Sequence, residues 1–237
     1  MTKRKDIKKS QLAANETEQQ IEVVEQALSR TELFLEKNQD KLLMIIFGIV
    51  AVFSVYLAYN KLYLQSEEQS AQTAMFQAEQ HFEKDSFNLA INGDETSLGF
   101  LQIIDEYGIT KSANLSYYYA GISYLNLGDF DKAIEYLEDF DSDDKIVKSM
   151  SIGAIGDAYM EKDETQKAIY YYEKAAENNV NDFSTPIFLM KKAIACEKLK
   201  KLDEALKIYE EIKSDFAKTS QGRNADKYIT KIKAIKK

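Results

Sequence analysis

An uncharged apolar segment constrains this chain more than any other feature. Residues 42–60 read LLMIIFGIVAVFSVYLAYN and contain no charged side chain. An α-helix needs roughly 20 mostly apolar residues to cross about 30 Å of hydrocarbon. The segment reaches that length when it is extended to 42–64, and Tyr56, Tyr59 and Tyr63 lie at its C-terminal end, where amphipathic rings favour the headgroup boundary. We therefore predict a transmembrane helix over 42–64, and a buried core helix is the alternative.

The residues around this segment predict its orientation. Eight basic side chains lie in residues 1–41, whereas Lys61 is the only basic residue that closely follows the apolar run. The positive-inside rule therefore places the N-terminus in the cytoplasm. The apolar run is followed by tyrosine, asparagine, lysine and leucine and not by a small-residue cleavage site. We expect it to remain attached as a signal anchor, with the rest of the chain outside the cytoplasm.

Charge and cysteine content limit what the part beyond the anchor can do. Residues 1–41 carry eight acidic side chains beside the eight basic ones, so the net charge of −8 lies in the rest of the chain. An acidic domain repels phosphate backbones, which disfavours a role with nucleic acid. The single cysteine excludes an intrachain disulfide, so the domain must be stable through its core alone.

The cytoplasmic part, residues 1–41, contains a basic tail and an amphipathic helix. Apolar residues recur from Ile21 to Leu35 at helical spacing, which predicts a helix over 15–37. This helix is either a linker lying on the membrane or on another copy, or a docking helix for a cytoplasmic partner. Beyond the anchor, residues 65–112 contain a juxtamembrane helix over 66–84, an irregular stretch and a further helical face from Leu98 to Tyr107.

An internal repeat dominates residues 113–219. Ala133, Ala168 and Ala205 align with offsets of 35 and 37 residues, close to the 34-residue period of tetratricopeptide repeats. In such units small residues let paired helices approach, aromatic residues fill the space between them, and no unit buries its face alone. The third unit is looser, because Cys196 stands where a tyrosine occurs in the others. The pattern resembles the tetratricopeptide family, with a degenerate unit before it and a capping helix over 220–237.

No motif indicates catalysis, so we expect a non-enzymatic protein without a cofactor. The chain has no Walker loop, no GxSxG and no HExxH, and its single histidine, His81, is interpreted as a helix-surface residue. We interpret Cys196 as a small buried hydrophobe, since no histidine is available to activate it. The acidic stretch EDFDSDDK resembles a calcium loop but lacks its glycine and its terminal glutamate. It is therefore predicted to be a turn that caps the next helix.

The resemblance to tetratricopeptide repeats implies a concave face lined by the first helix of each unit. Placing the groove positions of the family on this sequence selects Leu115, Tyr118, Ile122, Leu125, Met150, Asp157, Met160, Ile187, Met190, Ile194 and Glu197. Such an apolar, methionine-bearing surface can adapt to varied apolar sequences. We expect it to bind unfolded chain or an amphipathic partner helix. The alternative is that neighbouring helices of the chain itself cover these residues.

The order of the parts resembles one family more closely. The stretch TELFLEKNQDKLLMIIFGIVAVFSVYLAYNK, preceded by a basic tail and followed by a repeat domain, is similar to the YfgM-type ancillary subunits of the bacterial SecYEG translocon. The resemblance implies a single-pass inner-membrane protein with an all-α, periplasmic repeat domain. It also implies the translocon and a membrane-anchored periplasmic prolyl-isomerase-like chaperone as partners, and emerging polypeptides as clients. A structural subunit of another envelope complex is the alternative.

Overall fold

The computed structural model describes residues 34–236, and every regular element in that range is helical. The chain divides into two units, the first ending at Leu62 and the second beginning at Tyr63. The predicted basic tail and most of the predicted helix over 15–37 lie outside the described residues.

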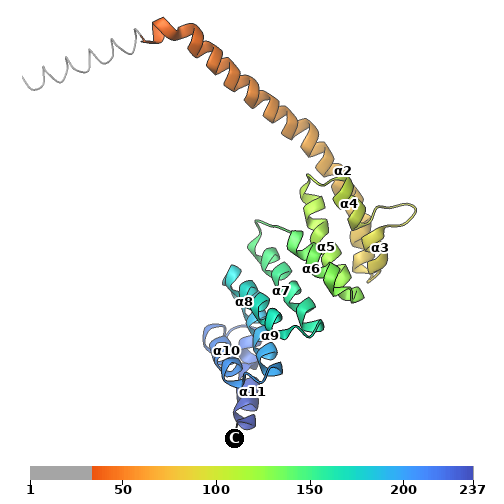
Figure 1. Ribbon diagram of the computed structural model, residues 1–237, viewed down its shortest axis with the longest axis vertical. Coiled ribbons are helices and arrows are strands. Elements are labelled where there is room, and N and C mark those ends of the chain that lie inside the picture. Colours follow the sequence, from red (N-terminus) through yellow and green to blue (C-terminus); the bar gives the residue numbers. More distant parts are fainter. Residues whose placement is uncertain (1–33, 237) are drawn as a thin grey trace, which may run out of the picture. The chain divides into compact units, whose positions relative to one another are not determined.

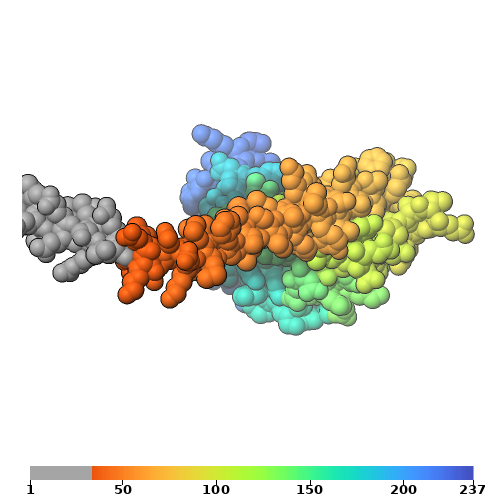
Figure 2. Space-filling view, turned by 90° about the horizontal axis from the view of Figure 1, so that it is seen from above, coloured from red at the N-terminus to blue at the C-terminus, as the bar shows by residue number. Residues whose placement is uncertain are grey.

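The first unit contains the predicted anchor. Residues 34–58 form an α-helix, and η1 (Tyr59–Leu64) follows as a π-helix. The side chains of residues 34–58 stand out around the helix, and nearly all of them are exposed (Figure 2). The helical run Phe34–Glu83 is the one helix of the described residues that is long and apolar enough to cross a membrane. The π-helix was not predicted, because apolar spacing does not distinguish i→i+4 from i→i+5 hydrogen bonding.

The second unit is a stack of α-helices that follow one another in chain order (Figure 1). Short connections join most of them, so successive helices pack as antiparallel neighbours. The helices are α2 (Gln65–Glu83), α3 (Phe87–Asn92), α4 (Phe100–Glu106), α5 (Lys111–Leu127), α6 (Phe130–Asp139), α7 (Lys145–Glu161), α8 (Thr165–Asn178), α9 (Thr185–Lys198), α10 (Leu202–Asp215) and α11 (Ser220–Ile235).

Small residues at the predicted positions hold each helix pair together. The pairs are α5–α6, α7–α8 and α9–α10, and the aligned alanines Ala133, Ala168 and Ala205 have no exposed surface. A Cβ added at Gly121 would lie 2.5 Å from Cγ of Leu137, so only glycine permits this approach of α5 to α6. The predicted role of small residues in the repeat is thereby confirmed.

The part of the stack before the repeats differs from the prediction in two ways. A short helix, α3, occupies a stretch that was expected to be irregular. In α4 the fully buried side chains are Phe100 and Ile103, whereas the expected face, which includes Leu101 and Ile104, is only half-buried. The reason is that α4 packs against α2, α3 and α5 together. These three helices enclose the side of α4 that carries Phe100 and Ile103 more completely than the apolar face that the sequence predicts.

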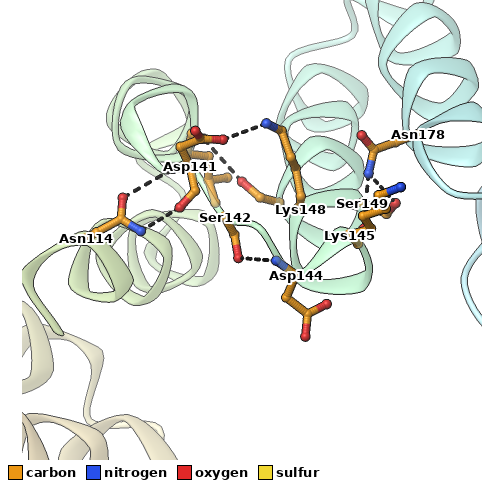
Figure 3. Close-up of polar contacts among 10 residues, drawn as sticks. Asn114, Asp141, Ser142, Asp144, Lys145, Lys148, Ser149 and Asn178 are labelled. Atoms are coloured by element: carbon orange, nitrogen blue, oxygen red, sulfur yellow. Dashed lines mark hydrogen bonds and ion pairs between the residues drawn. The ribbon is translucent and has the colours of Figure 1, made fainter. Parts of the chain in front are cut away.

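The acidic connection between α6 and α7, which Figure 3 draws, caps the second of these helices, as predicted. Asp144 Oδ1 accepts hydrogen bonds from the backbone N–H groups of Ile146 at 2.8 Å and Val147 at 3.2 Å. These N–H groups have no partner within the helix, so the carboxylate satisfies them and complements the helix dipole. The connection is therefore a capping turn.

Replacing Asp144 with alanine is expected to lower the free energy of unfolding by about 1 kcal/mol, because two N–H groups of α7 lose their acceptor. Asp143→Ala removes a neighbouring carboxylate that forms no cap of α7 and is expected to have almost no effect. Urea unfolding of the two variants measures the difference. Equal stability of both would contradict the capping role.

Candidate functional site

All eleven predicted groove residues lie on α5, α7 and α9, the first helices of the three pairs. Because the pairs repeat the same packing, these helices present equivalent faces. None of the eleven side chains is fully buried, and Ile194 is 44% exposed. Their apolar members from α5, together with Met150, Met160, Ile187 and Met190, also pack against the buried core. We call this set the groove face, and its role in binding stays a prediction.

A cleft of about 710 Å³ opens on this face between the first two helix pairs. It brings together Leu125 of α5 and Asp157 and Met160 of α7, with Phe130 and Tyr172 from the second helices of the pairs. These two aromatic residues were not among the predicted site residues. Phe130 begins α6 and Tyr172 lies in the middle of α8, and sequence reasoning assigned aromatic residues of the repeat to internal packing.

A second cleft, of about 390 Å³, lies between α2 and α5. Of the predicted residues it contains only Leu115, which lies there beside Met75, Phe76 and Glu79 of α2. Phe76 is more than half exposed. The face therefore extends to α2, a helix that precedes the recognisable repeats and whose residues the repeat alignment does not reach.

The carboxylates of the groove face are paired with lysines of the following first helix. Lys191 Nζ of α9 lies 2.6 Å from Asp157 Oδ2, and Lys231 Nζ of α11 lies 2.6 Å from Glu197 Oε2. Each pair joins residues 34 positions apart, which is one repeat period. Sequence reasoning named the two acids but not their partners, because a partner one full period away lies outside the spacing within one helix. The pairing leaves apolar side chains as the main contact groups on this part of the face.

In the second and third helix pairs, a tyrosine from the second helix completes this arrangement. Tyr172 OH donates a hydrogen bond to Asp157 at 2.8 Å, and Tyr209 OH donates to Glu197 at 2.7 Å. Burial, the charge of Asp157 and this hydrogen bond raise the pKa of Tyr172, while burial and the bond to Glu197 raise the pKa of Tyr209. Both phenols therefore remain protonated donors at neutral pH, and they fix the carboxylates toward the lysines.

The groups most capable of chemistry are occupied in structural roles. Cys196 is fully buried, and burial raises the pKa of its thiol to about 11, so it is not a nucleophile at neutral pH. His81 lies in α2 with a half-buried side chain, and its Nε2 lies 3.4 Å from Asp94 Oδ2. Among residues 34–236 no group of three or more potential ligands could hold a metal ion.

Comparison with known proteins identifies the repeats. Residues 115–143 and residues 151–179 each match a tetratricopeptide-repeat family model. In the third pair, α9 and α10 pack against each other as the helices of these two units do. No curated protein matches the chain.

Solved structures share the fold. Crystal structures of nearly identical TPR-like repeats, assigned to a kinesin light chain of Podosopora anserina, superpose with a TM-score of 0.54. The first structure is 15% identical in sequence, and the match covers 85% of its length. The second is 14% identical, and the match covers 86% of its length. Each match spans 70% of this chain. The chain therefore carries tetratricopeptide repeats in an all-helical solenoid. This fold is typical of non-enzymatic scaffolds for protein–protein interaction.

Proposed function

We propose that this protein is a membrane-tethered periplasmic scaffold of the bacterial inner membrane that assists the Sec translocon. It binds a partner chaperone or an emerging polypeptide through the groove face. The observation that carries the proposal is the set of half-exposed apolar side chains that α5, α7 and α9 present on the groove face. The two carboxylates of this face are already paired with lysines. A ligand of such a face contributes apolar side chains more than charges.

The proposed tether rests on the helix of the first unit. An α-helix that is apolar on all sides is stable when it is surrounded by protein or by lipid. The apolar window of this helix is not buried within the described chain, which favours lipid. The basic residues that precede it favour a cytoplasmic N-terminus and a periplasmic repeat domain.

The proposed clients follow from the chemistry of the groove face. Three of its apolar residues are methionines, whose flexible side chains repack around ligands of different shape. Emerging polypeptides are variable and expose apolar residues, and a partner chaperone can present an amphipathic helix. The translocon and a membrane-anchored prolyl-isomerase-like chaperone are proposed as neighbours because of the resemblance to YfgM-type subunits.

A double substitution, Tyr118→Asp with Met190→Asp, tests the groove face. Each change places a charge where a ligand buries apolar surface. The binding free energy lost at each position is about 1.5–3 kcal/mol, so the two changes together weaken binding by about 100-fold or more. Site-specific photo-crosslinking to a translocating chain and to the isomerase measures the effect. The expected result is loss of both crosslinks with an unchanged circular dichroism spectrum.

The matched control is Tyr170→Asp, which changes an exposed tyrosine of α8 that lines neither cleft. Its crosslinks should equal those of the unmodified protein. If the double variant is folded and crosslinks as well as this control, the groove face is not the binding site.

A further inference from the structure

The cleft between the first two helix pairs is formed where two helices end. It is lined by the last residues of α5, from Leu125 to Leu127, and by the last turn of α7, which includes Glu161. The C-terminus of an α-helix carries a partial negative charge of about half an elementary charge. Two such helix ends therefore contribute negative potential to one cleft of about 710 Å³.

The carbonyl groups at the end of α5 are only partly paired. The last four carbonyl oxygens of a helix have no N–H partner within that helix. In α5 the backbone N–H groups of Gly128 and Asp129 donate to two of these oxygens, at 3.2 Å and 3.0 Å. The other two oxygens belong to Asn126 and Leu127, and both of these residues line the cleft. They are acceptors that the helix itself leaves open.

Glu161 adds a full negative charge to the cleft. It is the last residue of α7, its side chain is exposed, and it forms no ion pair with a basic side chain of the described residues. Its neighbour Lys162 is paired with Asp131 and Glu164 instead. An acidic side chain at the C-terminus of a helix opposes the helix dipole and destabilises that helix. Local conflicts of this kind are expected where a residue serves binding.

The negative charge of the cleft is not offset by a basic side chain. Among the described residues, none of those that line the cleft is a lysine or an arginine. The second carboxylate in the cleft, Asp157, is already bound by Lys191 and by the hydroxyl of Tyr172. Lys132, near the start of α6, is paired with Asp129 at 3.1 Å. The cleft therefore keeps a net negative charge.

Apolar side chains lie beside the charged group. Leu125, Phe130 and Met160 are half-buried in the cleft, and Leu127 is 42% exposed. A volume of about 710 Å³ is within the range of pockets that enclose a drug-sized ligand, so the cleft takes a few side chains and not a folded partner. The side chain that suits it has an apolar stem and a cationic end with several donors. These are the features of lysine and arginine.

We propose that this cleft binds a lysine or arginine side chain of an unfolded polypeptide, with apolar residues of the same segment beside it. The cationic end pairs with Glu161 and donates to the open carbonyl oxygens of α5. The stem and the neighbouring apolar residues pack on Leu125, Phe130 and Met160. The inference rests on the proposed function, because it assigns a sequence preference to the clients of the groove face.

Two fluorescent peptides that differ at one position test this preference. Both are short apolar peptides of leucine and alanine, one with lysine and the other with glutamate at the centre. Their binding to the full-length protein in phosphatidylcholine nanodiscs is measured by fluorescence anisotropy, with empty nanodiscs as the blank. An exposed ion pair and a helix dipole each change affinity by a few-fold, so the lysine peptide is expected to bind about tenfold more tightly.

Glu161→Lys is the test variant, and Glu177→Lys is its matched control. Glu177 is an exposed glutamate in the last turn of α8 that does not line the cleft, so its replacement changes the net charge of the protein equally. Both substitutions place a basic side chain at the end of a helix, where it complements the helix dipole. Both variants should therefore fold as the unmodified protein does, which circular dichroism checks.

The expected result is a preference for the lysine peptide in the unmodified protein and in Glu177→Lys, and loss or reversal of this preference in Glu161→Lys. Equal binding of the two peptides to the unmodified protein, or an unchanged preference in Glu161→Lys, overturns the subsite for a basic side chain and leaves the groove face as a binding surface. Binding of neither peptide overturns the subsite and the proposed binding of unfolded chain together.

Discussion

Replacing Phe188 with alanine is expected to lower the free energy of unfolding of the repeat domain by about 3–5 kcal/mol. The ring is only 1% exposed and belongs to the largest buried cluster, which joins α7, α8, α9, α10 and α11. Its removal leaves a cavity that the surrounding helices cannot close completely. Because each helix pair depends on its neighbours, the loss affects the C-terminal half of the stack. Urea unfolding followed by circular dichroism measures it.

Phe183→Ala is the matched control, because it removes the same side chain from an exposed position in the connection that precedes α9. Its effect on the free energy of unfolding should lie within about 0.5 kcal/mol. Gly153→Ala adds a second test, since a Cβ there would lie 1.9 Å from Cε1 of Phe188. That variant should be destabilised by overpacking, and much less so when Phe188 is already alanine. Additive effects would contradict direct packing of α9 on Gly153.

Alkaline pH is expected to destabilise the repeat domain, because it deprotonates a buried thiol and two buried phenols. The pKa of the Cys196 thiol is raised from 9.0 to about 11, and the pKa values of Tyr172 and Tyr209 are also raised. A raised pKa in the folded state means that the folded chain holds the proton more tightly than the unfolded chain does. The stability from each group is complete below its unfolded pKa and is lost as the pH rises through its folded pKa.

The expected loss is about 1.4 kcal/mol per pH unit for each group that titrates in this window. Cys196 acts above about pH 9 and the tyrosines above about pH 10. Urea unfolding at about pH 8 and about pH 10.5 measures the slope, and Tyr172→Phe and Tyr209→Phe should reduce it. If the free energy of unfolding of the unmodified protein is constant between these two pH values, burial does not raise the pKa values of these groups.

The repeat could be predicted from the sequence because it rests on short-range rules. The small residues Ala133, Ala168 and Ala205 recur at nearly one period, and each has no exposed surface in the structure. The caps of the helices follow equally local rules, as Asp144 shows. The groove positions could be placed on their helices for the same reason, since the register of one helix face follows from the register of the repeat.

Contacts between repeats were harder to predict. The partners of Asp157 and Glu197 lie one period further along the chain, so local spacing does not reveal them. The contribution of α2 to the groove face was missed because α2 has no repeat pattern to align. The exposure of Val180 was missed for a different reason, because this residue lies in a connection rich in asparagine, where composition predicts only a polar turn.

The most direct test of the central proposal is purification of the full-length protein from its native membrane in mild detergent, with mass spectrometry of the copurifying proteins. The Tyr118→Asp, Met190→Asp variant is purified in parallel. The account predicts that the SecYEG channel and a membrane-anchored prolyl isomerase copurify with the unmodified protein, and that the isomerase or client chains are depleted with the variant. Recovery of a different envelope complex, without the channel, would contradict the translocon assignment.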